Sequence, residues 1–275
     1  MISYAICRDL PQSFSNCVTA VDLSQSAIDI TLAHQQHDEY VKVLKEHVAN
    51  VIQVSADEAH PDCCFVEDTC VVVKDTAVIN QLGHVSRQKE IGPNAEALKQ
   101  VPTLKNIVYM KDMDEKATLD GGDCMLVDDH LYVGLSARTN EQGAKVLEKA
   151  FSSRCKVVTI TALKDSPTLH LKCLVTQVNA DTLVACSNPA GKELIQEIKQ
   201  KSGVDYSVIF VPESVPANIL ALGSDFAVIQ KNFPESERIL VEELTEKRGI
   251  QLKALDMSEL IKADGALTCC SVLIP

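Results

Sequence analysis

Residues 70–79 read Cys-Val-Val-Val-Lys-Asp-Thr-Ala-Val-Ile, two short apolar runs separated by a polar turn that contains an aspartate. Runs rich in β-branched residues around such a tight turn are typical of a β-hairpin. An amphipathic stretch follows at residues 94–100, and a third apolar run follows at residues 107–110. This order predicts a unit of two antiparallel strands, a helix and a third strand.

The same unit recurs along the chain with turns that begin at Lys74, Asp128, Asn179 and Gly223, a period of about fifty residues. The later hairpins, helices and third strands are expected at residues 125–133, 141–151 and 157–160; at 174–186, 192–199 and 208–211; and at 219–229, 234–247 and 252–255. A fixed period of this length indicates a repeat architecture.

The two ends of the chain together supply a fifth unit. The last apolar run, residues 270–274, lacks a helix of its own, whereas the N-terminal part has a strand at 4–7, a helix at about 32–48 and a strand at 51–54. We therefore predict an α/β fold, a five-bladed α/β propeller of ββαβ units with pseudo-fivefold symmetry. Its first strands would line a central channel, and residues 1–275 would form a single domain. An ordinary layered α/β fold is the alternative.

Composition limits the class of protein. The net charge of −12 disfavours nucleic acid or an anionic membrane surface as a partner and is compatible with a small cationic substrate. The sequence has no basic and apolar leader, and no window of it approaches the roughly 18 apolar residues of a membrane span. The eleven cysteines are an odd number and form a poor disulfide framework. We expect a cytoplasmic protein with reduced thiols.

In a propeller, the residues just before each first strand face one mouth of the channel. Chemically reactive side chains are concentrated there, in residues 62–68 (DCCFVED), 119–123 (LDGGD), 168–172 (TLHLK) and 216–218 (PAN), and in Cys269 at the start of the last strand. A thiol, an imidazole and several carboxylates thus converge from distant parts of the chain.

These side chains suggest covalent thiol chemistry on a flat cation. A thiol must lose its proton to attack, and a bound cation would favour the thiolate of Cys269. His170 can protonate a leaving group and then activate water if a carboxylate, for which Asp120 is the candidate, fixes its tautomer. Glu67 and Asp68 offer oxygen pairs that match a guanidinium group.

Further residues fit this scheme. Arg138 follows a second strand and Arg87 has the corresponding place in the preceding unit, so both can bind a carboxylate. Gly121 and Gly122 would allow the backbone to come close to a substrate. Cys270 should point to the opposite face of its strand from Cys269.

The chain resembles the dimethylarginine dimethylaminohydrolase family of the guanidino-modifying (pentein) superfamily. The resemblance lies in residues 61–68 (PDCCFVED), 117–123 (ATLDGGD), 133–140 (VGLSARTN), 169–172 (LHLK) and 264–273 (DGALTCCSVL). It implies the five-bladed α/β propeller and a hydrolase of arginine metabolism and nitric oxide regulation. That hydrolase would convert asymmetric dimethylarginine and monomethylarginine to citrulline and dimethylamine or methylamine through a cysteine nucleophile.

The resemblance also implies a role for each matching position. It makes Cys269 the nucleophile, His170 the acid and base, Asp120 the support of the histidine, Glu67 and Asp68 the guanidinium ligands, Asp62 the ligand of the amino group, Arg87 and Arg138 the ligands of the carboxylate, and Asp264 with the backbone of Ala263 contacts near the nucleophile. The family has a flap near the N-terminus, expected here between Phe14 and Ile30, and Thr19 is assigned to it. No cofactor or metal is required, zinc at Cys269 and His170 would inhibit, and a monomer or weak homodimer is expected.

Two other classes of function remain open. Arginine deiminases, agmatine deiminases and amidinotransferases share the thiol, imidazole and carboxylate set, and the substrate that yields citrulline would separate the first of these from the prediction. A non-catalytic protein could instead bind zinc or sense redox state through Cys269, Cys270 and His170. A Cys269→Ser variant with normal hydrolysis would favour that reading.

Overall fold

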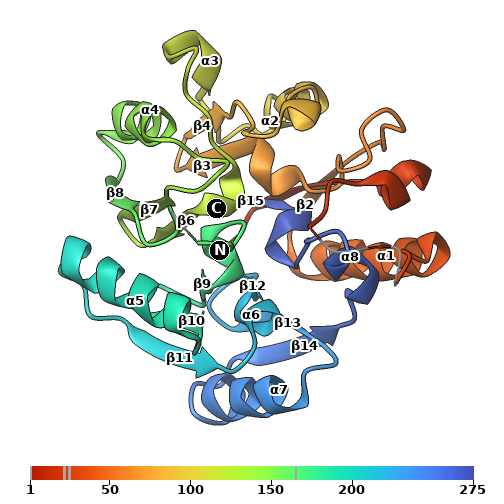
Figure 1. Cartoon of the computed structure of the whole chain (residues 1–275), viewed down its shortest axis with the longest axis vertical. Coiled ribbons are helices and arrows are strands. Elements are labelled where there is room, and N and C mark those ends of the chain that lie inside the picture. Colours follow the sequence, from red (N-terminus) through yellow and green to blue (C-terminus); the bar gives the residue numbers. More distant parts are fainter. Residues whose placement is uncertain (1, 21–22, 24–25, 165) are drawn as a thin grey trace.

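The computed structural model describes residues 2–20, 23, 26–164 and 166–275. Within these residues, the strands form five sheets of three strands each. In every sheet the middle strand is antiparallel to one neighbour and parallel to the other. Figure 1 looks down the axis around which the sheets are arranged. The predicted five-bladed α/β propeller of ββαβ units is confirmed.

From the axis outward, the sheets are β15 (Val272–Ile274), β1 (Tyr4–Arg8) and β2 (Asn50–Val54); β3 (Cys70–Val73), β4 (Thr76–Ile79) and β5 (Asn106–Tyr109); β6 (Cys124–Val127), β7 (His130–Gly134) and β8 (Lys156–Ile160); β9 (Val175–Gln177), β10 (Thr182–Cys186) and β11 (Ser207–Val211); and β12 (Leu220–Ala221), β13 (Phe226–Gln230) and β14 (Gln251–Leu255). Residues of all five inner strands line a central cavity, as the sequence predicts.

One long helix per blade connects the middle strand to the outer strand and lies on the outside of the ring (Figure 1). These helices are α1 (Ile30–His47), α2 (Ile91–Leu98), α4 (Glu141–Phe151), α5 (Pro189–Ser202) and α7 (Pro234–Leu240). Short helices α3 (Met110–Met113), α6 (Ser214–Ala217) and α8 (Ser258–Ile261) follow three of the outer strands. Side chains of Asp29, Asn140 and Asn188 accept hydrogen bonds from the first turns of α1, α4 and α5, which explains where these helices begin.

The prediction of one α-helix over residues 234–247 is wrong for the second half of this range. After α7 the chain continues as a π-helical segment, η6 (Val241–Glu246), in which the N–H of Lys247 bonds to the carbonyl of Glu242. The apolar residues Ile239, Leu240 and Leu244 place one face of the segment against the core, and this spacing does not reveal a single widened turn.

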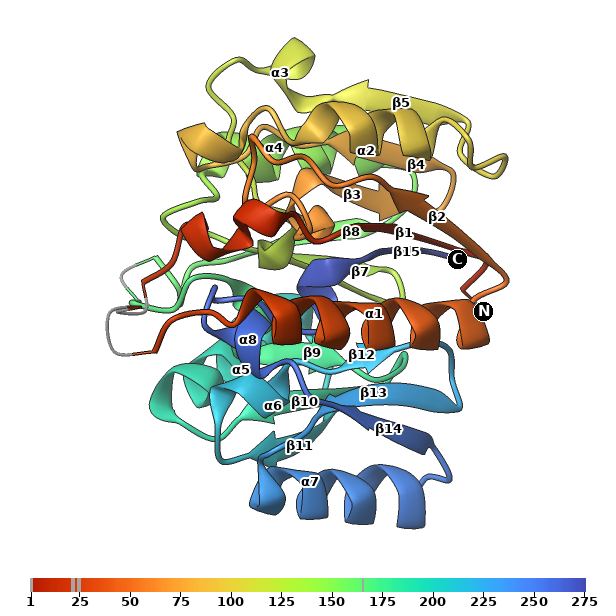
Figure 2. The same ribbon diagram turned by 90° about the vertical axis from the view of Figure 1, so that its right-hand side faces the viewer.

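The ring closes where the two ends of the chain meet. β15 pairs with β1 in an antiparallel register that sets Ile274 beside Tyr4 and Val272 beside Ile6. Figure 2 shows both termini at one end of the ring, with α8 displaced toward the other end. The first and last segments of the sequence therefore form one sheet, as predicted from the incomplete fifth unit.

The apolar core lies between neighbouring blades. Ile6 and Ile274 of the first blade, for example, share a cluster with Ile79 and Leu98 of the second. A single blade therefore cannot bury its own apolar face, and the interfaces between blades stabilise the ring. Among the described residues, no helix combines the length and apolar character needed to cross a membrane.

Candidate active site

Four short 3-10 helices precede inner strands, and Glu67, Asp68 and Cys269 lie in them, while Asp120 and His170 stand directly before two of them. The four helices are η2 (Val66–Thr69), η4 (Gly121–Asp123), η5 (Leu171–Cys173) and η7 (Thr268–Cys270). Residues adjacent in these turns face different cavities: Asp68 and Cys269 line a pocket at one mouth, whereas Glu67 and Thr268 line the central cavity. In η2 and η7, therefore, the position of a residue in the turn decides which of the two cavities its side chain faces.

The pocket is small and brings together side chains that are far apart in the sequence. The predicted site residues that line it are Asp62, Asp68, Arg87, Arg138, His170, Ala263, Asp264 and Cys269. The thiol and the imidazole therefore flank one pocket with carboxylates around it. This is the arrangement that covalent chemistry on a cation requires.

Asp120 lies behind His170 and is completely buried. Its Oδ2 is 3.1 Å from His170 Nε2, and its Oδ1 accepts a 2.9 Å hydrogen bond from the Gly83 N–H. Burial alone lowers the pKa of His170, but the carboxylates of Asp68, Asp120 and Asp123 outweigh it and raise the pKa to about 9. His170 is therefore an imidazolium at neutral pH in the free protein.

Gly122 allows the histidine to occupy this position. A Cβ on Gly122 would lie 2.7 Å from His170 Nδ1, and the Gly122 N–H donates a 3.0 Å hydrogen bond to Asp68 Oδ1. A Cβ on Gly121 would lie 2.0 Å from the carbonyl oxygen of Glu67. The sequence explained both glycines by a close approach to substrate, whereas in the structure they allow neighbouring turns to pack against each other.

Asp68 and Arg87 form a buried ion pair beside the pocket, with Arg87 Nη1 2.6 Å from Asp68 Oδ2. Burial raises the pKa of Asp68, but His170 and Arg87 reverse the effect and hold it at about 2. Arg87 also donates to both carboxylate oxygens of Glu90 and to the Phe65 carbonyl. Most of its N–H groups are thus already engaged, so the protein itself holds the guanidinium in place.

Cys269 is protonated in the free protein. Burial raises the pKa of its thiol well above the ordinary value, and the nearby carboxylates of Glu67 and Asp68 raise it further. Cys270 lies on the other side of the turn, fully buried, with its Sγ 3.7 Å from the Ala266 carbonyl oxygen. The sequence predicts that the two thiols alternate along a strand, but both lie in η7 and β15 begins only at Val272; Cys269 nevertheless lines the pocket, whereas Cys270 is in the core.

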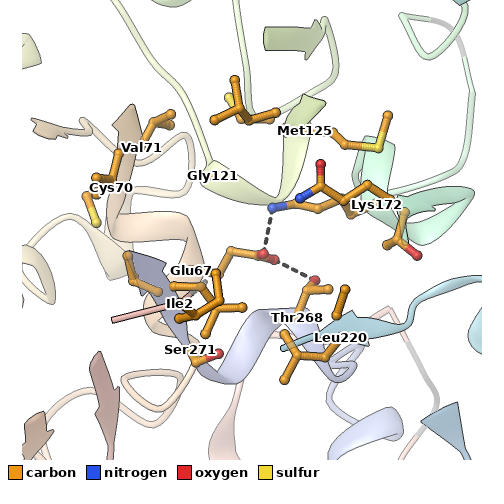
Figure 3. Close-up of a pocket in the computed structure, with 18 of the residues that line it drawn as sticks. Ile2, Glu67, Cys70, Val71, Gly121, Met125, Lys172, Leu220, Thr268 and Ser271 are labelled. Carbon is orange, nitrogen blue, oxygen red and sulfur yellow. Dashed lines mark hydrogen bonds and ion pairs between the residues drawn. The ribbon is translucent and has the colours of Figure 1, made fainter. Parts of the chain in front are cut away.

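The structure places Glu67 away from the pocket, so its role as a guanidinium ligand stays a prediction. Its carboxylate faces the central cavity, and it contacts Lys172 Nζ at 2.5 Å and Thr268 Oγ1 at 2.8 Å (Figure 3). Burial raises the pKa of Glu67, and the ammonium of Lys172 offsets part of this. Of the two adjacent carboxylates, Asp68 alone reaches the pocket, because η2 turns its neighbour away.

The flap predicted between Phe14 and Ile30 lies in part outside the described residues, at positions 21–22 and 24–25. Its described beginning contacts two acidic residues of the site. The Val18 N–H donates to both oxygens of Asp62 at 3.1 and 3.2 Å, and the Ala20 N–H donates to Asp264 at 2.7 Å. Thr19 Oγ1 is 3.1 Å from Asp264 Oδ2, but its neighbour Val18 is the residue that lines the pocket.

The sequence did not identify the apolar wall of the pocket, formed by Val18, Phe65 and Leu169. Phe65 packs edge-on against Phe14, with ring centroids 5.8 Å apart. A Cβ on Gly265 would lie 2.3 Å from the ring of Phe65. Phe65 and Leu169 stand inside the segments that the sequence singles out for their polar residues, so those segments also contain the signal for the apolar wall.

Among the described residues, three side chains at and behind the wall of the pocket are near enough to share a metal ion. Single ligand atoms of Asp68, Asp120 and His170 all lie within 4.8 Å of one another. Because Arg87 and the Gly122 N–H already bind Asp68, a metal ion would have to compete with these contacts.

Comparison with known proteins agrees with this geometry. A family model described as N,N dimethylarginine dimethylhydrolase, eukaryotic, matches residues 12–273. The N(G),N(G)-dimethylarginine dimethylaminohydrolase of Streptomyces coelicolor is 29% identical over 265 residues, 96% of this chain and 94% of that one. The structure of DDAH from Pseudomonas aeruginosa, a cysteine-to-serine variant complexed with citrulline, matches with a TM-score of 0.80 at 26% identity and covers 100% of both chains.

A more distant structure shares the fold. The N-terminal domain of ArgZ, a cyanobacterial arginine dihydrolase, gives a TM-score of 0.79 at 16% identity and covers 98% of this chain and 97% of that one.

Proposed function

Because this chain belongs to the family of N,N dimethylarginine dimethylhydrolases, we propose that it hydrolyses asymmetric dimethylarginine and monomethylarginine to citrulline, with release of dimethylamine or methylamine. One observation carries the proposal. A thiol, an imidazolium and a carboxylate that stays ionised, those of Cys269, His170 and Asp68, line the same small pocket.

The charges around the pocket support one orientation of the substrate. Asp68 would accept hydrogen bonds from the guanidinium, which places its central carbon near the Cys269 sulfur. Asp62, which now binds the Val18 N–H, would also meet the substrate ammonium, and Asp264, which binds the Ala20 N–H, would contribute near the nucleophile together with the backbone of Ala263. Arg138 and the remaining donor capacity of Arg87 would bind the substrate carboxylate.

In the first half of the reaction, the bound cation offsets the burial that keeps the thiol protonated, and the thiol loses its proton to solvent. The thiolate of Cys269 attacks the guanidinium carbon and a carbon–sulfur bond forms. His170, protonated up to a pH of about 9, donates its proton to the methylated nitrogen. The carbon–nitrogen bond breaks, the amine leaves and an S-alkylthiouronium group remains on the enzyme.

In the second half, the now neutral His170 accepts a proton from a water molecule whose oxygen attacks the same carbon. The carbon–sulfur bond breaks, the new hydroxyl group gives up its proton and citrulline leaves, and the Cys269 thiolate takes up a proton to restore the thiol of the free protein. Asp120 supports the imidazole in both halves because its carboxylate lies 3.1 Å from the ring nitrogen.

The decisive experiment measures citrulline release from asymmetric dimethylarginine, monomethylarginine and arginine. We expect activity on the methylated substrates, and a fall of at least about 10³-fold in the Cys269→Ser variant. Cys270→Ser is the matched control because it removes the adjacent buried thiol on the other side of the turn. Preference for unmethylated arginine would contradict the assignment, and normal hydrolysis by Cys269→Ser would contradict the mechanism.

We propose further that no cofactor or metal takes part. The mechanism moves every proton through His170 and solvent, so activity should survive treatment with a chelator. Zinc would inhibit by binding His170 together with Cys269 or with the carboxylates of Asp68 and Asp120, which are near enough to share an ion. Loss of activity with a chelator, and its return with zinc, would contradict this view.

The cytoplasm is the proposed location, and a monomer or weak homodimer the proposed state. The eleven cysteines are all free, which suits a reducing compartment. Sedimentation at several protein concentrations would test the oligomeric state, and a tight higher oligomer would contradict it.

A further inference from the structure

We infer that Asp123 is a positioning residue that holds His170 and Arg138 in their places relative to each other. The inference rests on the proposed function, since it assigns these two residues to catalysis and substrate binding. Taken from the sequence alone, Asp123 has a simpler explanation, as a turn residue at the entry to a strand. Its hydrogen bonds show that it does more than end a turn.

Asp123 is completely buried, and both of its carboxylate oxygens are engaged. Oδ1 accepts a 3.0 Å hydrogen bond from the N–H of Leu171, the residue that follows His170. Oδ2 accepts hydrogen bonds of 2.6 Å from the hydroxyls of Ser136 and Thr139, which flank Arg138. One carboxylate thus joins the turn of the imidazole to the turn of the guanidinium.

A second route leads from Asp123 to the imidazole. Thr139 Oγ1, which donates to Asp123, accepts a 3.1 Å hydrogen bond from the Asp120 N–H. The side chain of Asp120 in turn contacts His170 Nε2. His170 is therefore held twice, through the backbone beside it and through the carboxylate behind it, and both routes begin at Asp123.

The same contacts explain why the residue is an aspartate. Ser136 Oγ already accepts from the N–H groups of Arg138 and Thr139, at 3.0 and 3.2 Å, so it can only donate to Asp123. An amide nitrogen at this Oδ2 position would present a donor to a hydroxyl that has no acceptor site left. A carboxylate satisfies all three donors, whereas an asparagine leaves at least one of them unpaired.

Two variants separate the two halves of this arrangement. Ser136→Ala removes the support of the Arg138 turn, so we expect KM to rise by about 3- to 10-fold with kcat nearly unchanged. Thr139→Val removes the link to the Asp120 backbone, so we expect kcat to fall by a similar factor. Asp123→Asn should reduce kcat/KM by about 10²-fold, since it disturbs both turns.

Thr76→Val is the control for a purely structural loss. Thr76 is buried like Thr139, and its hydroxyl bonds to the side chains of Asp75 and Asn106. It lies next to the turn between β3 and β4, at the end of this hairpin that is remote from η2. We expect this variant to lose thermal stability without a change in KM or kcat. If Ser136→Ala and Thr139→Val also lose thermal stability without a change in KM or kcat, the inference is overturned. These two variants decide the matter even where Asp123→Asn does not fold.

A readout without substrate separates this inference from the proposed function. The ring ¹H–¹⁵N resonances of His170 in the free protein should shift in Thr139→Val and Asp123→Asn and stay unchanged in Thr76→Val. Failure of the proposed function would appear in the wild-type protein, as absent citrulline release. Failure of the inference would appear only in the variants, as unaltered histidine resonances and unaltered kinetics.

Discussion

At the scale of single residues, the free protein holds its two reacting groups in the protonated form. Burial and the carboxylates of Glu67 and Asp68 raise the pKa of the Cys269 thiol, and carboxylates raise the pKa of His170 to about 9. In the proposed mechanism the acid is therefore ready before the substrate arrives, whereas the nucleophile is not. A cation bound in the pocket would lower the pKa of the thiol, so the mechanism favours charged substrates.

Asp120→Asn tests the source of the histidine's raised pKa. The wild-type kcat/KM should fall as pH rises through about 9, because His170 loses the proton it must donate. Removing the Asp120 charge lowers that pKa, so the alkaline limb should move toward neutral pH. A pH profile of citrulline release measures it. If Asp120→Asn lowers the maximum of kcat/KM but leaves the alkaline limb at the same pH, a group other than His170 is responsible for that limb.

The same pKa has a consequence for stability. His170 has a folded pKa above its unfolded value of about 6.5, so its ionisation stabilises the fold fully below that pH. The contribution is lost as pH rises through about 9. Unfolding measured across this window should show a smaller decline in Asp120→Asn than in the wild type.

Gly122→Ala tests the contact between glycine and imidazole. The added methyl group would lie 2.7 Å from His170 Nδ1 and 3.1 Å from Asp68 Oδ1, so the ring has to move. We expect a loss of about 10²-fold in kcat from a displacement near 1 Å. Gly92→Ala is the control, since a Cβ there has no neighbour within 4 Å. Equal activity of the two variants would remove the argument.

These residues also show which features of the site can be predicted from the sequence. The types and spacing of Cys269 and His170 predicted that these two side chains meet, and both line one pocket, with Asp120 in contact with the imidazole. The orientation of Glu67 could not be predicted. Both it and Asp68 are acidic, and only the geometry of a 3-10 turn decides which of the two faces the pocket.

At the scale of elements, an ion pair links turns from three blades. Lys172 of η5 binds Glu67 of η2, and Glu67 binds Thr268 of η7, as Figure 3 shows. The chain neighbours of Glu67 and Thr268 are Asp68 and Cys269, which line the catalytic pocket. The contacts of Glu67 therefore fix the position of the Asp68 carboxylate relative to the Cys269 thiol.

Lys172→Met should destabilise the fold by about 3 kcal/mol, because it leaves the Glu67 carboxylate buried without its partner. The double variant Lys172→Met with Glu67→Gln should recover most of this loss, since no unpaired charge remains. Urea unfolding of the single and double variants measures both values. Lys99→Met serves as control for an exposed pair on α2 and should change stability little. If the double variant is no more stable than Lys172→Met, the unpaired charge is not the cause.

The elements themselves were largely predictable. Hairpins such as 70–79 show strong β-branched runs around a polar turn, and helix α4 agrees with the expected residues 141–151 because its cap and amphipathic pattern coincide. The π-helical segment after α7 was not predictable, since a single widened turn keeps the same apolar residues facing the core. His37 is buried on the side of α1 that also buries Tyr40 and Leu44.

At the scale of the whole molecule, the ring makes the site possible. The residues of the pocket come from near both ends of the chain, from Val18 to Cys269, and closure between β1 and β15 brings them together. Periodicity predicted the closure because the four complete units left one strand at the C-terminus and a helix and two strands at the N-terminus. The contact between the flap and the site could not be predicted from periodicity, because the flap is not part of the repeated unit.

Circular permutation tests whether closure, rather than chain order, determines the fold. The Ser3 N–H lies 2.9 Å from the Ile274 carbonyl, so a short glycine linker can join the two termini. New ends can be placed at Ala180, an exposed residue in the turn between β9 and β10. Since every sheet keeps its three strands, we expect the permuted enzyme to fold and to keep kcat/KM within about threefold.

The comparison protein for this experiment lacks residues 272–275 and so has no β15. It should lose cooperative unfolding and activity, because β1 loses its inner partner and the cluster around Ile6 and Ile79 opens to water. Differential scanning calorimetry and citrulline release measure both outcomes. A permuted chain that fails to fold, or a truncated chain that unfolds like the wild type, would show that closure through β15 does not hold the ring together.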